Sequence, residues 1–285
     1  MTKTSLKLFD FNPENALGKP LVNLAYANGF PPQIYRAALE PLFKDYHVIS
    51  LHARPLWGDS APAPESLTSW EQLGNDLLAA LDGFTDQPVI GIGHSVGGVA
   101  TLFAAVKRPD RFSRLVLIEP TLLAPHLLWA MRLLESRGNR QRRGLVEGAL
   151  RRRSTWKNTD EAYQYFKGKR LFARWPDEVL REYVTSLTAP GADGNIHLTW
   201  SPEWEAQIYR TLITDGWKLP RRLKPPTLVI RGNLSDTFTT ASALTFRLLN
   251  PRARMALVHG AGHLVPQEQP AAVGQLIVDF VRSNT

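Results

Sequence analysis

Two hydrophobic patterns alternate along most of this chain. Short apolar runs rich in β-branched residues, typical of strands buried on both faces of a sheet, are separated by segments whose apolar residues recur every three or four positions, as on one face of a helix. The alternation predicts an α/β fold with a mostly parallel sheet and helices on both faces. The predicted strands lie at 5–11, 20–26, 47–51, 89–92, 115–118, 226–232 and 254–258, and clear helical spacing lies at 70–81, 99–106 and 270–282.

The alternation stops between residues 121 and 220. This region has helical patches at 122–134 and 177–187, six of the eight tryptophans and most of the arginine excess, and it lacks a convincing β-branched strand. We therefore expect residues 121–220 to form a helical cap, inserted into a core domain made of residues 1–120 and 221–285.

The change from strand to helix at Ser95 is the most informative point in the sequence. Ser95 is the centre of Gly-His-Ser-Val-Gly at 93–97, so it lies on a tight corner where glycines let the strand and the helix pass closely. A serine at a helix start is also a common N-cap. The buried strand before it and the small-residue helix after it favour a nucleophile. A dinucleotide site is excluded, because no third glycine follows at the required spacing.

A serine hydroxyl needs a base to take its proton, and imidazole titrates near neutral pH. His263 follows the last predicted strand in a glycine-rich loop, which places it at the same carboxyl edge of the sheet as Ser95. His94 is next to Ser95 in sequence, but neighbouring residues in such a corner point apart, so we expect His94 to pack or to form hydrogen bonds. We assign structural roles to the remaining histidines.

The base in turn needs a carboxylate to hold its tautomer. Asp236 lies in the loop after the strand at 226–232, and Glu119 ends the strand at 115–118, so either could reach the base. We favour Asp236, because a loop aspartate reaches more easily than a glutamate held before Pro120. The structural alternative for Asp236 is a turn or a helix cap.

Acyl transfer also needs hydrogen-bond donors for the oxyanion that forms on the substrate. The backbone N–H of Val96, at the start of the helix after Ser95, is the first expected donor. The second is the N–H of Phe30, in the loop Asn28-Gly29-Phe30 after an earlier strand.

Composition narrows the possible partners. Cysteine is absent, so disulfides and thiolate metal sites are excluded and a reducing, cytoplasmic location is expected. The N-terminus lacks a signal-peptide pattern, and no run approaches the ~18 apolar residues of a membrane span. The net charge of +8 comes largely from arginines between 132 and 153. We interpret these as a solvated helix face and not as a nucleic-acid site, because no aromatic residues alternate with them.

With Ser95, Asp236 and His263 in this chain order, the sequence resembles the α/β-hydrolase family, in its capped serine branch. The resemblance implies an eight-stranded type of sheet and hydrolysis of a carboxylic ester or related acyl bond. Ser95 would attack, His263 would relay the proton and Asp236 would orient His263. Family members usually carry His-Gly where this chain has Asn28-Gly29. Haloalkane dehalogenases and epoxide hydrolases of the family have an aspartate at the nucleophile position, so Ser95 argues against both activities.

We therefore expect a small-molecule acyl substrate, no cofactor, no metal, no nucleic-acid partner, and a monomer or homodimer. The same triad serves carbon–carbon bond hydrolases, lactonases and cofactor-free haloperoxidases, and a ligand-binding protein without catalysis is a further alternative. The aromatic cap predicts an apolar pocket. The candidates to line it are Asn28, Trp57, Trp129, Trp156 and Trp175.

Overall fold

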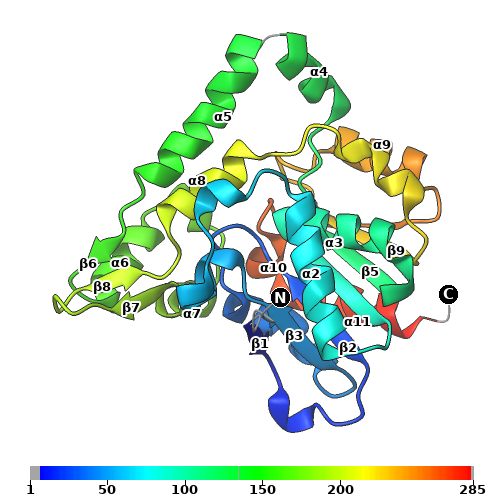
Figure 1. Ribbon diagram of the computed structural model, residues 1–285, viewed down its shortest axis with the longest axis horizontal. Coiled ribbons are helices and arrows are strands. Elements are labelled where there is room, and N and C mark those ends of the chain that lie inside the picture. The colour runs from blue at the N-terminus through cyan, green and yellow to red at the C-terminus, as the bar shows by residue number, and fades with distance from the viewer. Residues whose placement is uncertain (1–6, 134, 284–285) are drawn as a thin grey trace.

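The computed structural model describes residues 7–133 and 135–283, and these form a central β-sheet, flanking helices and a further segment, residues 121–220, between two neighbouring strands of the sheet (Figure 1). We refer to this segment as the cap. The sheet has seven strands in the described residues, in the order β1-β3-β2-β4-β5-β9-β10. β1 is antiparallel to β3, and all other pairs are parallel. The strands are β1 (Leu8–Asp10), β2 (Leu21–Ala25), β3 (His47–Leu51), β4 (Val89–His94), β5 (Phe112–Ile118), β9 (Thr227–Gly232) and β10 (Arg254–Val258).

The predicted α/β fold is confirmed. All residues of β4 and β9, the strands that lead toward the predicted nucleophile and acid, are buried, as their apolar runs predict. Helix α2 packs on α3, and α1 packs on α11, as two pairs of helices covering the sheet. The core helices are α1 (Arg36–Leu39), α2 (Glu71–Phe84), α3 (Val96–Lys107), α9 (Thr240–Leu249), α10 (Val265–Glu268) and α11 (Pro270–Arg282).

The segment 121–220 differs from the expected all-helical cap. It contains a three-stranded antiparallel sheet in the order β6-β8-β7, which the sequence interpretation missed because its strands are only two or three residues long and show no periodicity. Figure 1 shows α4 and α5 reaching away from the central sheet, with β6, β7 and β8 at one end of the molecule. The elements are α4 (Pro125–Leu133), α5 (Glu135–Leu150), β6 (Thr155–Trp156), α6 (Thr159–Lys167), α7 (Asp177–Leu187), β7 (Thr188–Pro190), β8 (Ile196–Leu198) and α8 (Pro202–Arg210).

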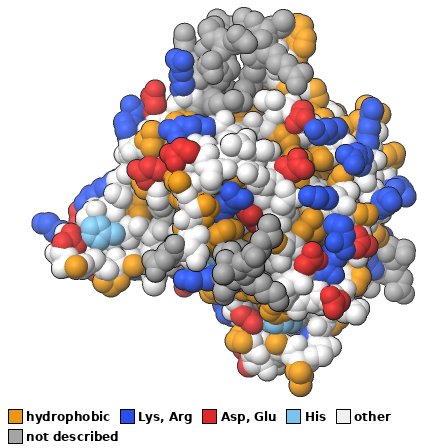
Figure 2. Space-filling model, in the orientation of Figure 1, with side chains coloured by type: hydrophobic (Ala, Val, Ile, Leu, Met, Phe, Trp, Pro, Cys, Tyr) orange, Lys and Arg blue, Asp and Glu red, His pale blue; other side chains and the backbone are white. Residues whose placement is uncertain are grey.

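Basic side chains do not gather into one patch on the face shown in Figure 2, where they alternate with acidic ones. Each arginine of the triplet 151–153 has a carboxylate partner: Glu147, Glu205 and Glu161 respectively. The side chains of residues 130–142, which include several cap arginines, lie outside the described residues. No helix in the described part of the chain is long and apolar enough to cross a membrane.

Candidate active site

Ser95 occupies the corner between β4 and α3, as the sequence predicts. Its backbone has φ 57° and ψ −122°, a region that residues with a Cβ rarely adopt. The close approach of strand and helix requires Gly97, because a Cβ there would lie 2.1 Å from the carbonyl oxygen of Ala25 in β2. Such strain persists only where the surrounding structure enforces it, and it is frequent at functional sites.

His263 meets Ser95 from the loop after β10. Its Nε2 lies 2.9 Å from the Oγ of Ser95, the distance of a hydrogen bond through which a proton can move. The hydroxyl of Thr121 lies 3.1 Å from the same Oγ, on the segment that follows β5. Sequence reasoning missed Thr121, although its place just beyond the carboxyl end of a buried strand was a usable signal.

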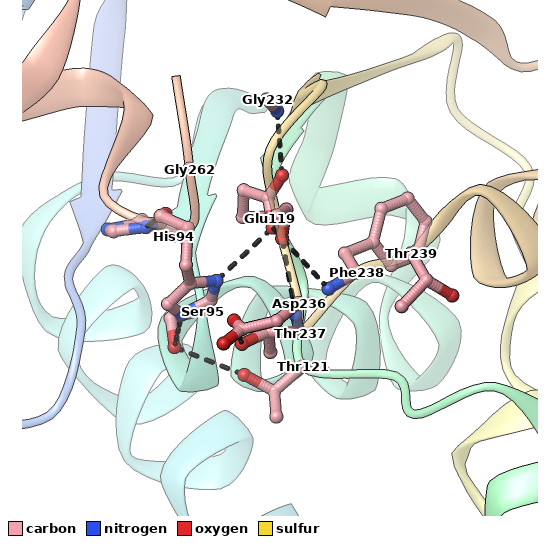
Figure 3. A network of polar contacts seen from close by, with 12 residues as sticks. His94, Ser95, Glu119, Thr121, Gly232, Asp236, Thr237, Phe238, Thr239 and Gly262 are labelled. Atoms are coloured by element: carbon pink, nitrogen blue, oxygen red, sulfur yellow. Dashed lines mark hydrogen bonds and ion pairs between the residues drawn. The ribbon is translucent and has the colours of Figure 1, made fainter. Parts of the chain in front are cut away.

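The carboxylate beside His263 is that of Glu119. Its Oε2 lies 3.2 Å from the Nδ1 of His263, and the side chain is fully buried. The N–H of Gly232 donates to Oε1 of the same carboxylate at 2.7 Å, a contact that Figure 3 shows between Glu119 and Gly232. The hydroxyl of Ser235 donates to Oε2. Ser95, His263 and Glu119 therefore form one continuous chain of hydrogen bonds.

The structure does not place Asp236 in that chain. The prediction that Asp236, and not Glu119, contacts His263 was therefore wrong. Within the described residues, Asp236 accepts a hydrogen bond from the hydroxyl of its neighbour Thr237 at 3.3 Å, and it makes none with His263. Two backbone features explain why Glu119, and not Asp236, contacts His263. The turn after β9 directs Ser235, one residue earlier, toward Glu119. Glu119 itself has φ 47°, which turns the end of β5 so that its side chain reaches the histidine despite Pro120.

His94 is buried next to the site and forms hydrogen bonds there, as the sequence predicts. The hydroxyl of Tyr35 lies 2.7 Å from its Nδ1, and its Nε2 lies 2.9 Å from the backbone oxygen of His263. Burial, together with the nearby His263, lowers the pKa of His94 to about 3. The ring is therefore neutral, and its Nε2–H donates to the carbonyl of His263. The N–H of Ala27 donates to the same tyrosine hydroxyl, so this network joins the loop after β2, the end of β4 and the loop after β10.

The two expected oxyanion donors have different surroundings. Val96 opens helix α3, where the first N–H groups have no carbonyl partner one turn earlier in the helix. The N–H of Phe30 instead donates to the carbonyl of Ala27 at 3.2 Å, in a turn where Gly29 has φ 76°. The Phe30 amide is therefore engaged in the structure, at a distance near the long end for an N–H···O bond.

A cavity of about 390 Å³ opens over Ser95 and His263. Its described lining is mostly apolar and combines cap residues, including members of α5 and α8, with core residues. It includes Ser95, His263, Val96, Phe30, Asn28, Trp70, Thr121, Leu123, Leu145, Leu171, Ile208, Tyr209, Leu212, Asp236, Thr237, Leu264 and Ala27. Its volume falls at the low end of the range for small-molecule sites, about 300–1,000 Å³.

The tryptophans predicted to line this cavity lie elsewhere. Trp156 and Trp175 are buried in the aromatic core of the cap, and Trp129 is 66% exposed. Trp57 lines a separate cavity of about 80 Å³ that shares Asn28, Val96 and other residues with the larger one. The tryptophan on the active-site cavity is Trp70, whose indole N–H donates to the carbonyl of Ile208 in α8 at 3.0 Å.

Comparisons with known proteins agree with an α/β-hydrolase fold. Residues 26–276 match the family model described as "Alpha/beta hydrolase family". The chain is 26% identical to "AB hydrolase superfamily protein YfhM" of Bacillus subtilis, over 93% of this chain and 91% of that protein. It is 26% identical to the "2-hydroxy-6-oxononadienedioate/2-hydroxy-6-oxononatrienedioate hydrolase" of Cupriavidus pinatubonensis, over 85% and 79%. The crystal structure of "E-2-(Acetamidomethylene)succinate Hydrolase" superposes with a TM-score of 0.81 at 19% identity, over 98% and 95%.

Proposed function

Because the chain belongs to the α/β-hydrolase family, we propose that it is a serine hydrolase that cleaves a carboxylic ester or related acyl bond of a small, largely apolar substrate. The observation that carries the proposal is the hydrogen-bonded chain Ser95–His263–Glu119 at the floor of a mostly apolar cavity. This arrangement suits a hydroxyl nucleophile, a base and an acid that orients the base.

In the first half of the reaction, Ser95 Oγ attacks the substrate carbonyl carbon while its proton passes to His263 Nε2. The Nδ1–H of His263 then faces Glu119, whose charge stabilises the imidazolium. Gly232 N–H and Ser235 Oγ–H fix the carboxylate in place. The proton is thus held at Nε2 until the leaving group accepts it.

The oxyanion forms next to the start of α3, where the Val96 N–H and the positive end of the helix dipole stabilise it. We assign the second donor to the Phe30 N–H. This assignment requires the amide to turn from the Ala27 carbonyl toward the bound substrate, and its 3.2 Å bond is a weak one to give up. Loss of one such donor costs about 100- to 1,000-fold in rate.

In the second half, a water molecule attacks the acyl-enzyme and gives its proton to His263, which returns it to Ser95. The acid product leaves through the cavity. No metal or organic cofactor takes part in any of these steps, and water is the only co-substrate.

Cleavage of a carbon–carbon bond is the second candidate, because one relative is named as a hydrolase of a 2-hydroxy-6-oxo-dienedioate. That substrate carries two carboxylates. The described lining of the cavity here holds one acidic side chain, Asp236, and no lysine or arginine, so an uncharged acyl substrate suits it better. Epoxide opening, named for another relative at 22% identity, is disfavoured by the serine nucleophile.

The test is release of p-nitrophenol from acetate, butyrate, octanoate and palmitate esters by the wild type and by Ser95→Ala. We expect turnover by the wild type, with an optimum at short or medium chains because the cavity is small, and a loss of at least about 1,000-fold in the variant. A folded wild type that hydrolyses none of the four esters would refute the ester proposal and favour carbon–carbon cleavage or binding without turnover.

A further inference from the structure

Asp236 is the one charged side chain in the described lining of the active-site cavity, apart from the titratable His263. It is exposed, and Figure 3 shows its side chain on the side of the loop where Ser95 and Thr121 lie. Since Glu119 serves His263, the charge of Asp236 is not used by the triad. We propose that Asp236 selects substrates by charge: the cavity accepts neutral or cationic acyl groups and rejects those that carry a free carboxylate. This inference rests on the proposed function.

The charge of Asp236 is not cancelled by a salt bridge. Within the described residues it has no ion-pair partner. Arg174, from the cap, interacts with it electrostatically. Arg174 is itself committed to Glu268, with Nε to Oε2 at 2.8 Å and Nη2 to Oε1 at 3.2 Å, and this pairing raises the pKa of Arg174. Within the described residues, the carboxylate of Asp236 therefore lines the cavity without a cation in hydrogen-bonding contact.

The remaining lining of the cavity strengthens the electrostatic effect of the Asp236 carboxylate on a bound substrate. Ten of the seventeen described lining residues are apolar, among them five leucines, Ile208 and Trp70. The polar members Thr121, Thr237, Tyr209 and Asn28 are uncharged. An apolar wall lowers the effective dielectric constant, so a second negative charge in the same cavity is repelled more strongly than it would be in water.

The size of the effect follows from Coulomb's law. A substrate carboxylate about 6 Å from Asp236, at an effective dielectric constant between about 20 and 40, is disfavoured by roughly 10- to 100-fold in binding. A cationic group at the same place gains up to the same factor, reduced by its own loss of hydration.

The experiment compares three p-nitrophenyl esters of equal chain length: the hexanoate, the adipate monoester with a terminal carboxylate, and 6-(trimethylammonio)hexanoate. We measure kcat/KM for the wild type, Asp236→Asn, Asp236→Lys and the control Asp86→Asn. Asp86 is exposed and lies before β4, whose length of about 20 Å separates it from Ser95. Asp86→Asn therefore removes the same charge far from the cavity.

For the wild type we expect the adipate monoester to be at least about tenfold poorer than the hexanoate, and the cationic ester to equal or exceed it. Asp236→Asn is expected to remove most of this difference and Asp236→Lys to reverse it, while Asp86→Asn keeps the wild-type ratios. Equal kcat/KM for the adipate and hexanoate esters, or an unchanged ratio in Asp236→Asn, would overturn the inference.

Calorimetric titration of the same esters into Ser95→Ala separates this inference from the proposed function. If the wild type turns over no ester but the variant binds them in the order cationic or neutral before anionic, the hydrolase proposal fails and the charge selection stands. If the variant binds them without that order, or binds none, the charge selection fails too.

Discussion

Replacing Glu119 by glutamine tests which carboxylate orients His263. The glutamine side chain has nearly the same shape, so its oxygen can still accept from the Gly232 N–H in place of Oε1. Its NH₂ group then faces His263 Nδ1, where Oε2 stands 3.2 Å away in the wild type. Because an NH₂ group can only donate, Nδ1 must give up its proton, and the imidazole keeps that proton on Nε2 instead.

An imidazole protonated on Nε2 cannot accept the proton of Ser95. Wrong-tautomer substitutions in Ser-His-Asp triads lower kcat by about 10⁴-fold. Glu119 is fully buried and the substitution also removes the charge that stabilises the imidazolium. We therefore expect kcat/KM to fall by about 10³- to 10⁴-fold, equivalent to about 4–5.5 kcal/mol at ~1.36 kcal/mol per tenfold change.

The assay is kcat/KM on p-nitrophenyl butyrate at pH 8, with thermal unfolding to verify that each variant is folded. Asp236→Asn is the matched comparison, and we expect it to lose no more than about tenfold on this neutral ester, since it acts on substrate charge and not on His263. The reasoning is refuted if Glu119→Gln stays within tenfold of the wild type while Asp236→Asn loses about 1,000-fold. That result would return the acid to the loop after β9.

Two further predictions concern stability. Burial lowers the pKa of His94 in the folded protein to about 3, below its ordinary 6.5. The contribution of His94 to the free energy of unfolding is therefore complete above pH 6.5 and is lost at up to ~1.4 kcal/mol per pH unit as the pH falls toward 3. In urea unfolding between pH 7 and 4.5, the free energy of unfolding of His94→Gln should fall less steeply with pH than that of the wild type, by about one proton, and an unchanged pH dependence would contradict a neutral buried ring. Gly97→Ala forces a Cβ to within 2.1 Å of a backbone oxygen and is expected to cost more than about 3 kcal/mol or to prevent folding, whereas Gly148→Ala, at an open helical position, should raise stability by about 0.5–1 kcal/mol in thermal unfolding.

The core of the fold was predictable because its elements have strong, unambiguous patterns. The strands at 47–51 and 254–258 and the helix at 270–282 have the predicted bounds. Ser95 and His263 were also placed together correctly, because both follow buried parallel strands, and the carboxyl ends of such strands meet at one edge of the sheet.

The acid could not be chosen in this way, because it depends on the backbone of two short loops. A positive φ at a glutamate has no sequence signature, unlike one at glycine. One residue of difference in the turn after β9 decides whether Ser235 or Asp236 faces Glu119. The helices at 125–133 and 177–187 of the cap follow predicted helical patches, but its small sheet was not predictable, because its strands are too short to show a period. The direction of Trp156 and Trp175 was not predictable either, since both pack against phenylalanines of the cap and not toward the cavity.

The position of Glu119 has a consequence for substrate recognition. Ser95 and Glu119 both follow neighbouring strands with positive φ, and each is fixed by a sheet hydrogen bond, from Ser95 N–H to Ile118 O at 3.0 Å and from Glu119 N–H to Ile230 O at 2.8 Å. The proposed nucleophile and the proposed acid are thus held by the sheet itself. The loop after β9 needs to supply only the Ser235 hydroxyl to the triad, so the next residue, Asp236, can face the cavity and act on the substrate.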